Sequence, residues 1–233
     1  MEPVPRNLKI LTGITIVLFL TALYMVFIYA PREAIMGDVQ RVFYFHVAAG
    51  WVGALAFLVT AIAGGVYLAK REPKWDRLAE SSVEIGVVFT IINISSGSIW
   101  ARPIWNTWWT WDPRLVTATI MLLLYFAYLM LRQGIEDPDR RARFGSVYGI
   151  AAFISVPVTF LSIRLFRTIH PVVIGSSDPA AEGAFDMTAR MVQALMFSVL
   201  TFTFVYATLL RYRIRLGRGT EEVEKRKMEL ISL

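Results

Sequence analysis

Hydrophobic residues along this chain gather in six long stretches without a charged side chain, and the charged residues fill the gaps between them. The six stretches are 17 to 28 residues long and run Ile10–Pro31, Val42–Ala69, Ile85–Ala101, Leu115–Leu131, Phe144–Ile163 and Met191–Leu210. A helix that rises 1.5 Å per residue needs about 20 apolar residues to cross a bilayer core. Strands of a membrane barrel would alternate in polarity over about 10 residues, and these stretches do not alternate. The pattern predicts an all-α membrane protein with a bundle of six transmembrane helices.

Composition supports this class. The chain of 233 residues is 56% hydrophobic with a mean hydropathy of +0.53, whereas soluble domains are about 45–50% apolar. This excludes a soluble globular enzyme, a disordered chain and a coiled coil. The first stretch is longer than a signal-peptide core and has no small-x-small cleavage site before Pro31, so we expect it to remain as a helix.

We expect one transmembrane domain over residues 1–212 and a charged cytoplasmic tail over residues 213–233. Within the tail, Thr220–Leu233 alternates acidic and basic residues and is expected to be a solvated helix.

Lysine and arginine predict the orientation of the bundle. If the N-terminus is cytoplasmic, 17 of the 24 basic residues fall on the inner side and 7 on the outer side. The positive-inside rule therefore places both termini in the cytoplasm. It leaves three outer loops, near residues 31–42, 100–114 and 164–190.

The middle outer loop is rich in tryptophan. The segment Trp100–Arg114 holds five of the seven tryptophans in the chain. Trp105, Trp108, Trp109 and Asp112 are spaced i, i+3, i+4 and i+7, which would place them on one face of a helix. We therefore expect a short amphipathic helix on the outer face that presents a platform for a flat, polarisable ligand such as a porphyrin. An aromatic belt at headgroup depth is the alternative interpretation.

Both histidines of the chain are expected near this platform. His46 lies near the outer end of the second stretch, and His170 follows the fifth. Neutral imidazole is a common axial ligand of haem iron, although a hydrogen-bonded residue at a helix end is the simpler alternative. Pro157 should kink the fifth helix and could aim His170 towards the platform. Arg102 and Arg114 flank the platform and could pair with carboxylates.

Several functions are excluded or left open. The chain has no cysteine, so it cannot hold haem through thioether bonds or zinc through thiolates. It has no phosphate-binding loop of the G-x-x-x-x-G-K-[ST] type and no recognisable pair of nucleophile and base, so we do not expect an enzyme. The basic residues flank apolar stretches and do not indicate nucleic acid. A haem-binding and transfer protein, a b-type cytochrome subunit and a cofactor-free scaffold subunit of a transporter remain.

Three features together resemble the haem-handling membrane proteins of cytochrome c biogenesis, most closely the haem exporter protein C family. They are the run Arg41–His46, the run Trp108-Trp-Thr-Trp-Asp-Pro-Arg114, and a histidine after the fifth stretch. The resemblance covers about residues 8–212. Asn106 stands where the family often has glycine.

The resemblance implies non-covalent binding of haem b on the periplasmic side of the bacterial inner membrane. It places His46 and His170 as axial ligands, with Trp105, Trp108, Trp109, Trp111 and Asp112 in the haem-binding segment. It also implies work with ATP-binding cassette transporter subunits, a small single-span membrane subunit and a periplasmic haem chaperone that accepts the haem.

Overall fold

The computed structural model describes residues 3–171 and 187–231, and its regular structure there is helical apart from one isolated bridge between Glu33 and Gly37. The elements are α1 (Arg6–Tyr24) with a π-helical extension η1 (Met25–Tyr29), α2 (Gln40–Lys70), α3 (Pro73–Trp105), α4 (Pro113–Gln133), α5 (Pro138–Phe153), α6 (Ser155–Leu165) and α7 (Ala189–Ile231).

Six helical segments in the described part of the chain are long and apolar enough to cross a membrane, as the charge-free stretches predict. The fifth segment runs Pro138–Leu165 and combines α5 and α6, which are separated only at Ile154. This break lies three residues before Pro157, whose ring removes one backbone donor from the helix. The helix is therefore interrupted near the proline for which a kink was predicted, and the protein is an all-α multi-pass membrane protein.

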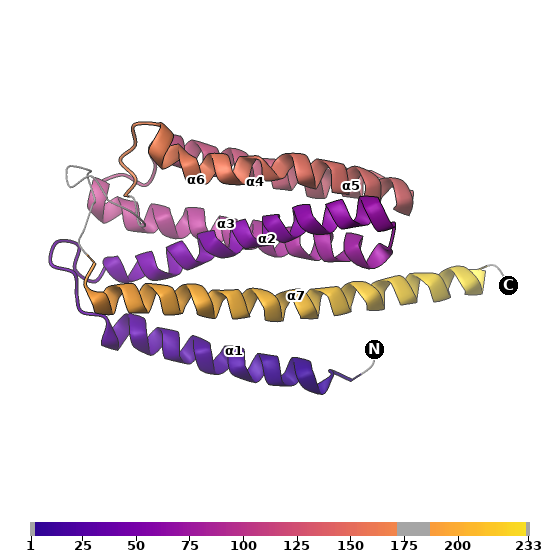
Figure 1. The fold of residues 1–233 in the computed structure, drawn as a ribbon, viewed down its shortest axis with the longest axis horizontal. Helices are drawn as coiled ribbons and strands as arrows, with labels where there is room; N and C mark the ends of the chain where they lie inside the picture. The colour runs from indigo at the N-terminus through magenta and orange to yellow at the C-terminus, as the bar shows by residue number, and fades with distance from the viewer. Residues whose placement is uncertain (1–2, 172–186, 232–233) are drawn as a thin grey trace.

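Figure 1 shows the helices side by side, with the loops after η1, α3 and α6 at one end and the first turn of α1 at the other. We call the end with these three loops the outer end, and the end with the first turn of α1 the inner end. Helix α2 is central, because it packs against α3, α5 and α7. Its buried aromatic and small residues, including Phe43, Ala49 and Phe57, contribute to all three clusters of the hydrophobic core.

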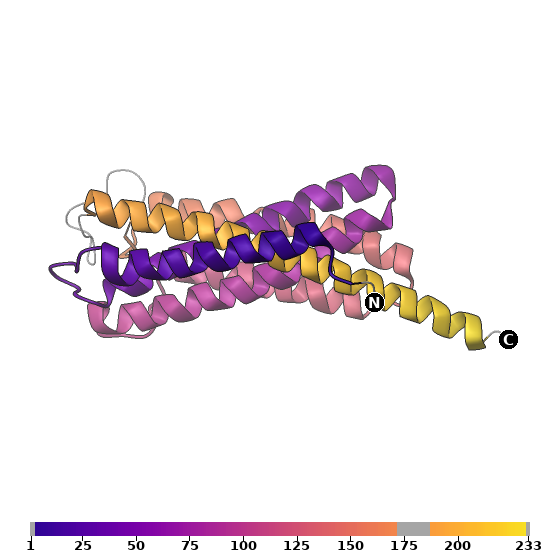
Figure 2. The same cartoon turned by 90° about the horizontal axis from the view of Figure 1, so that it is seen from below.

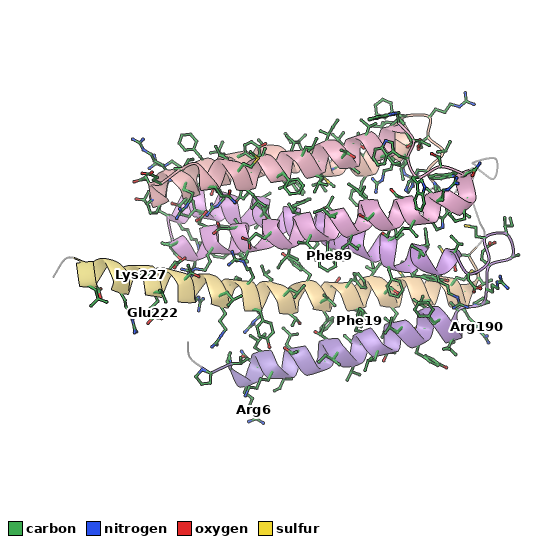
Figure 3. All side chains as sticks on the ribbon, turned by 180° about the vertical axis from the view of Figure 1, so that it is seen from behind. Arg6, Phe19, Phe89, Arg190, Glu222 and Lys227 are labelled. Carbon is green, nitrogen blue, oxygen red and sulfur yellow. The ribbon has the colours of Figure 1, made fainter. Side chains whose placement is uncertain are left out.

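Charged side chains tie the helices together at the inner end. Arg132 of α4 is buried and binds Asp76 of α3 through two hydrogen bonds of 2.6 and 3.0 Å. Arg213 of α7 binds Glu84 of α3 at 2.7 Å. In Figure 3, Arg6 and Glu222 lie towards the inner end, Arg190 lies at the outer end, and Phe19 and Phe89 lie between them. This distribution is expected of a bundle whose middle faces lipid.

Helix α7 is continuous from Ala189 to Ile231 and extends beyond the other helices at the inner end, as Figure 2 shows. The expected helix in the C-terminal tail is therefore confirmed through Ile231. No interruption separates it from the membrane-spanning part of α7.

Candidate haem-binding site

His46 is held in place by α3. The residue lies two turns into α2, and its Nδ1 is 2.9 Å from the backbone oxygen of Asn93. The amide of Asn93 in turn donates to the backbone oxygen of His46 at 2.8 Å. Because a carbonyl oxygen can only accept, Nδ1 carries the proton in the neutral ring, and Nε2 on the opposite edge presents its lone pair. The contact fixes both the tautomer and the direction of the ring, as outer-shell partners of metal-binding histidines do.

Gly97 makes this arrangement possible. A Cβ atom at Gly97 would lie 2.8 Å from Cε1 of His46, which is too close for any other side chain. A residue without a side chain is therefore needed at this position of α3 for the imidazole ring of His46 to pack against the helix.

His170 faces His46 from the segment that follows α6. The two ring centres are 6.4 Å apart, and the ring planes are inclined by 38°. Nδ1 of His170 lies 3.2 Å from the backbone oxygen of Pro171. Burial, together with the smaller effect of the positive charge of Arg114, lowers the pKa of His170 from 6.5 to about 3. The ring is therefore neutral near pH 7, which is the form that binds metals.

Asp112 connects this segment to α4. Its carboxylate caps α4 by accepting a hydrogen bond from the backbone N–H of Arg114 at 2.9 Å. The same carboxylate accepts from the hydroxyl of Thr168 at 2.7 Å and from the backbone N–H of Ile169 at 3.0 Å. One buried side chain thus anchors the two residues that immediately precede His170.

The expectation of a short amphipathic helix over Trp105–Asp112 is wrong. Helix α3 continues to Trp105 and ends at Asn106, which has a φ of +54°, and no helix is present between Asn106 and Pro113. Asparagine tolerates this left-handed conformation better than most residues. Proline at position 113 disfavours helical geometry at Asp112, so the segment crosses from α3 to α4 in an irregular conformation.

Arg102 takes part in this chain reversal. Its guanidinium donates to both the backbone oxygen and the side-chain oxygen of Asn106 at 2.6 Å each. It therefore closes the C-terminal end of α3 and does not line the pocket between the histidines. Arg114 does line the pocket, where its guanidinium donates to the backbone oxygen of Thr159 and lies 4.7 Å from the ring centre of Phe160.

A pocket between α3 and α4 brings the two histidines together with four of the tryptophans. Its aromatic and charged lining consists of His46, Trp100, Trp105, Trp108, Trp109, Arg114 and His170. Trp111 lies outside this lining and its side chain is 84% exposed, whereas Trp108 is 58% exposed and borders the pocket. The irregular backbone therefore divides the expected platform. Trp111 lies outside the pocket with its ring edge-on to that of Trp109, and Asp112 binds the segment before His170.

The arrangement suits a metal that is already held by a planar ligand. Two imidazoles that bind one metal from opposite sides, each at about 2 Å, would place their ring centres roughly 6 Å apart. No group of three or more potential metal-binding side chains is found among the described residues. Two protein ligands are sufficient for haem iron, since the porphyrin supplies the other four.

The cavity itself is narrow. Its volume of about 60 Å³ is well below the ~300–1,000 Å³ of pockets that enclose small molecules. The cavity as described is therefore too small to enclose a whole porphyrin.

Four residues that form this site were not identified from the sequence: Asn93, Gly97, Trp100 and Thr168. Asn93 carried a recognisable signal, because an amide at membrane depth usually meets a specific partner. Trp100 is buried and forms an edge-on contact with Trp105, with ring centres 5.1 Å apart. Nothing in the sequence indicates that Thr168 binds Asp112, because the contact joins residues that are 56 positions apart.

The fold and the site define a multi-pass helical membrane protein with a two-histidine, tryptophan-lined pocket at its outer end. The family model "Heme exporter protein C" matches residues 2–229, and the chain belongs to this family. It is 29% identical over 215 residues to a "Heme exporter protein C" of Bradyrhizobium diazoefficiens, a match that covers 90% of this chain and 81% of that protein.

Two further relatives also match over more than two thirds of both chains. A "Heme exporter protein C" of Rhodobacter capsulatus is 29% identical over 216 residues, which is 92% of this chain and 88% of the relative. A "putative cytochrome c biosynthesis ccmC-like mitochondrial protein" of Marchantia polymorpha is 27% identical over 165 residues, which is 71% of this chain and 70% of the relative. The resemblance seen in the sequence motifs is thus confirmed at the level of the family.

Proposed function

We propose that this protein exports haem for cytochrome c biogenesis by binding haem b non-covalently at its outer end and passing it to a periplasmic haem chaperone. The observation that carries the proposal is the pair of facing imidazoles, with ring centres 6.4 Å apart, in a tryptophan-lined pocket. Iron held by two histidines has no open position for oxygen, so the site suits transfer of haem better than catalysis.

Different residues of the chain would contribute to haem binding in different ways. His46 and His170 bind the iron, while Trp105, Trp108 and Trp109 contact the porphyrin faces. Arg114 is placed to pair with a propionate. Asp112 and Arg102 act indirectly, since the first anchors the His170 segment and the second closes α3. Trp111, which the sequence places in the haem-binding set, is more suited to contact a partner because its ring is exposed.

The small volume of the cavity supports transfer of haem to an acceptor protein. A haem whose rim stays outside the protein can be reached by a second protein before the axial bonds break. We propose a location in the bacterial inner membrane with both termini in the cytoplasm. The partners would be ATP-binding cassette transporter subunits, a small single-span membrane subunit and the chaperone.

An absorption spectrum of the purified protein tests this proposal. The wild-type protein, expressed with ample haem, should show the bands of low-spin haem. His46→Ala and His170→Ala should each lose low-spin character or haem occupancy, and added imidazole should partly restore the spectrum by filling the vacated position.

The other functions give different spectra. An unchanged spectrum in both variants would show that the two histidines are not ligands of the haem iron. The absence of a Soret band in the wild-type protein would favour a scaffold subunit. Stable redox cycling of bound haem with a quinol would favour a b-type cytochrome.

A further inference from the structure

Helices α1 and α7 are joined in the membrane but separate towards the inner end. Two hydroxyl contacts close the interface, between Thr15 and Thr208 at 2.8 Å and between Thr12 and Tyr212 at 3.1 Å. Next to them a groove of about 520 Å³ lies between the first turn of α1 and residues 211–222 of α7. Figure 1 shows α7 continuing past the beginning of α1 at this end.

The groove is basic. Arg211, Arg215 and Arg218 line it from α7 at positions i, i+4 and i+7, which lie on one helix face. Glu222 also borders the groove, but its carboxylate is bound to Arg226 at 2.8 Å. In the described part of the chain, no carboxylate lies within ion-pair distance of Arg211 or Arg218. The groove therefore carries an excess of positive charge at a concave surface.

The groove lies at the level where α7 is expected to leave the membrane. Arg211 is the first charged residue after the uncharged stretch of α7. The groove also contacts apolar side chains, namely Leu8, which is buried, and Ile214. A phospholipid has the same order of charged and apolar groups across the membrane, because its phosphate lies at the surface and its acyl chains lie below it.

We propose that this groove binds the phosphate of an anionic phospholipid, such as phosphatidylglycerol, between α1 and α7. Guanidinium groups bind phosphate through paired hydrogen bonds, and Arg211 and Arg218 line the groove without a carboxylate at ion-pair distance among the described residues. Basic pockets beside transmembrane helices are typical sites for anionic headgroups. The bound lipid would cross-link the two helices where their hydroxyl contacts end, and it would do so independently of haem.

Native mass spectrometry of the full-length protein, released from nanodiscs with equal amounts of phosphatidylglycerol and phosphatidylcholine, tests the proposal. The wild-type protein should retain phosphatidylglycerol preferentially. The triple variant Arg211→Gln, Arg215→Gln, Arg218→Gln should bind it roughly 100-fold more weakly, since each basic residue near an anionic surface contributes a factor of about five. The single variant Arg218→Gln should lose about fivefold.

A matched variant separates a defined groove from general positive charge. Arg140→Gln, Arg141→Gln, Arg143→Gln removes the same charge from α5 at the same end and should retain the lipid as the wild type does. Equal losses in both triple variants, or unchanged retention in the α7 variants, would overturn the proposal. Displacement of the lipid by millimolar inorganic phosphate would also overturn it, because the groove would then be a site for a soluble anion. Circular dichroism of each variant establishes that it is folded.

Discussion

Asp112 shows how a single carboxylate can join two parts of a site that are distant in sequence. It caps α4 and at the same time holds the backbone before His170. Hydrogen bonds to a charged acceptor contribute more than neutral ones, about 1.5–3 kcal/mol each. In the proposed site Asp112 would therefore position His170 without itself contacting haem.

We expect Asp112→Ala to weaken haem binding roughly 10- to 100-fold, because the His170 segment loses its anchor. The melting temperature of the protein should also fall, since α4 loses its cap. Thr168→Val keeps the bond to the Ile169 N–H and should have a smaller effect. Haem titration of the purified variants measures the change. If haem binds normally to the Asp112→Ala protein but transfer to the acceptor fails, Asp112 contacts the partner instead.

The pH dependence of His170 follows from its burial. Its pKa is lowered to about 3, so the folded protein keeps this ring neutral over a pH range in which an unfolded chain, with a pKa near 6.5, takes up a proton. Between pH 6.5 and pH 3 the unfolded state therefore binds more protons, and the free energy of unfolding should decrease as the pH falls.

Histidine-labelled His46→Ala protein allows a direct measurement, because only His170 then contributes a signal. Its NMR resonance should not titrate between pH 8 and pH 5 in the haem-free protein. A midpoint near 6.5 would show that the ring is exposed to water and would contradict the buried position.

At the scale of elements, the conformation of the segment between α3 and α4 determines which tryptophans line the pocket. A helix through residues 105–112 would place Trp105, Trp108, Trp109 and Asp112 on one face. The observed segment keeps the first three at the pocket, turns Asp112 towards residues 168–169, and leaves Trp111 exposed. The difference arises from Asn106 and Pro113, which end one helix and begin the next.

Alanine substitutions in this segment should therefore have unequal effects. Trp108→Ala and Trp109→Ala should each cost about 2–4 kcal/mol of haem binding, the usual range for a binding hot spot, which is roughly a 30- to 1,000-fold loss of affinity. Trp111→Ala should leave haem affinity unchanged. Trp75→Ala, at the inner end of α3, is the control and should also have no effect. Equal, small losses at Trp75, Trp108 and Trp109 would favour an aromatic belt.

At the scale of the whole molecule, both chemistry-bearing histidines and the tryptophan segment lie at the end opposite the first turn of α1. The basic residues are concentrated at the inner end, and the positive-inside rule assigns that end to the cytoplasm. The haem pocket would then open to the periplasm.

Reporter fusions test this orientation. A reporter after Leu233 or within residues 136–141 should be cytoplasmic, and a reporter within residues 176–184, which lie outside the described residues, should be periplasmic. A cytoplasmic reporter at residues 176–184 would place the pocket on the wrong side of the membrane for transfer to a periplasmic acceptor.

The sequence by itself determined the number and approximate bounds of the membrane helices, because a bilayer imposes a length and an apolar composition on each helix regardless of its neighbours. It also indicated Pro157 as a break and both histidines as candidates, since these residues are rare and have specific chemistry. Only the tertiary structure revealed that Asn93 and Gly97 hold His46, that Asp112 holds the segment before His170, and that Trp111 lies outside the pocket. The first two relations join residues that are far apart in the chain. The position of Trp111 depends on the left-handed backbone of Asn106 and the extended backbone of Asp112. Helical periodicity contains no information about either.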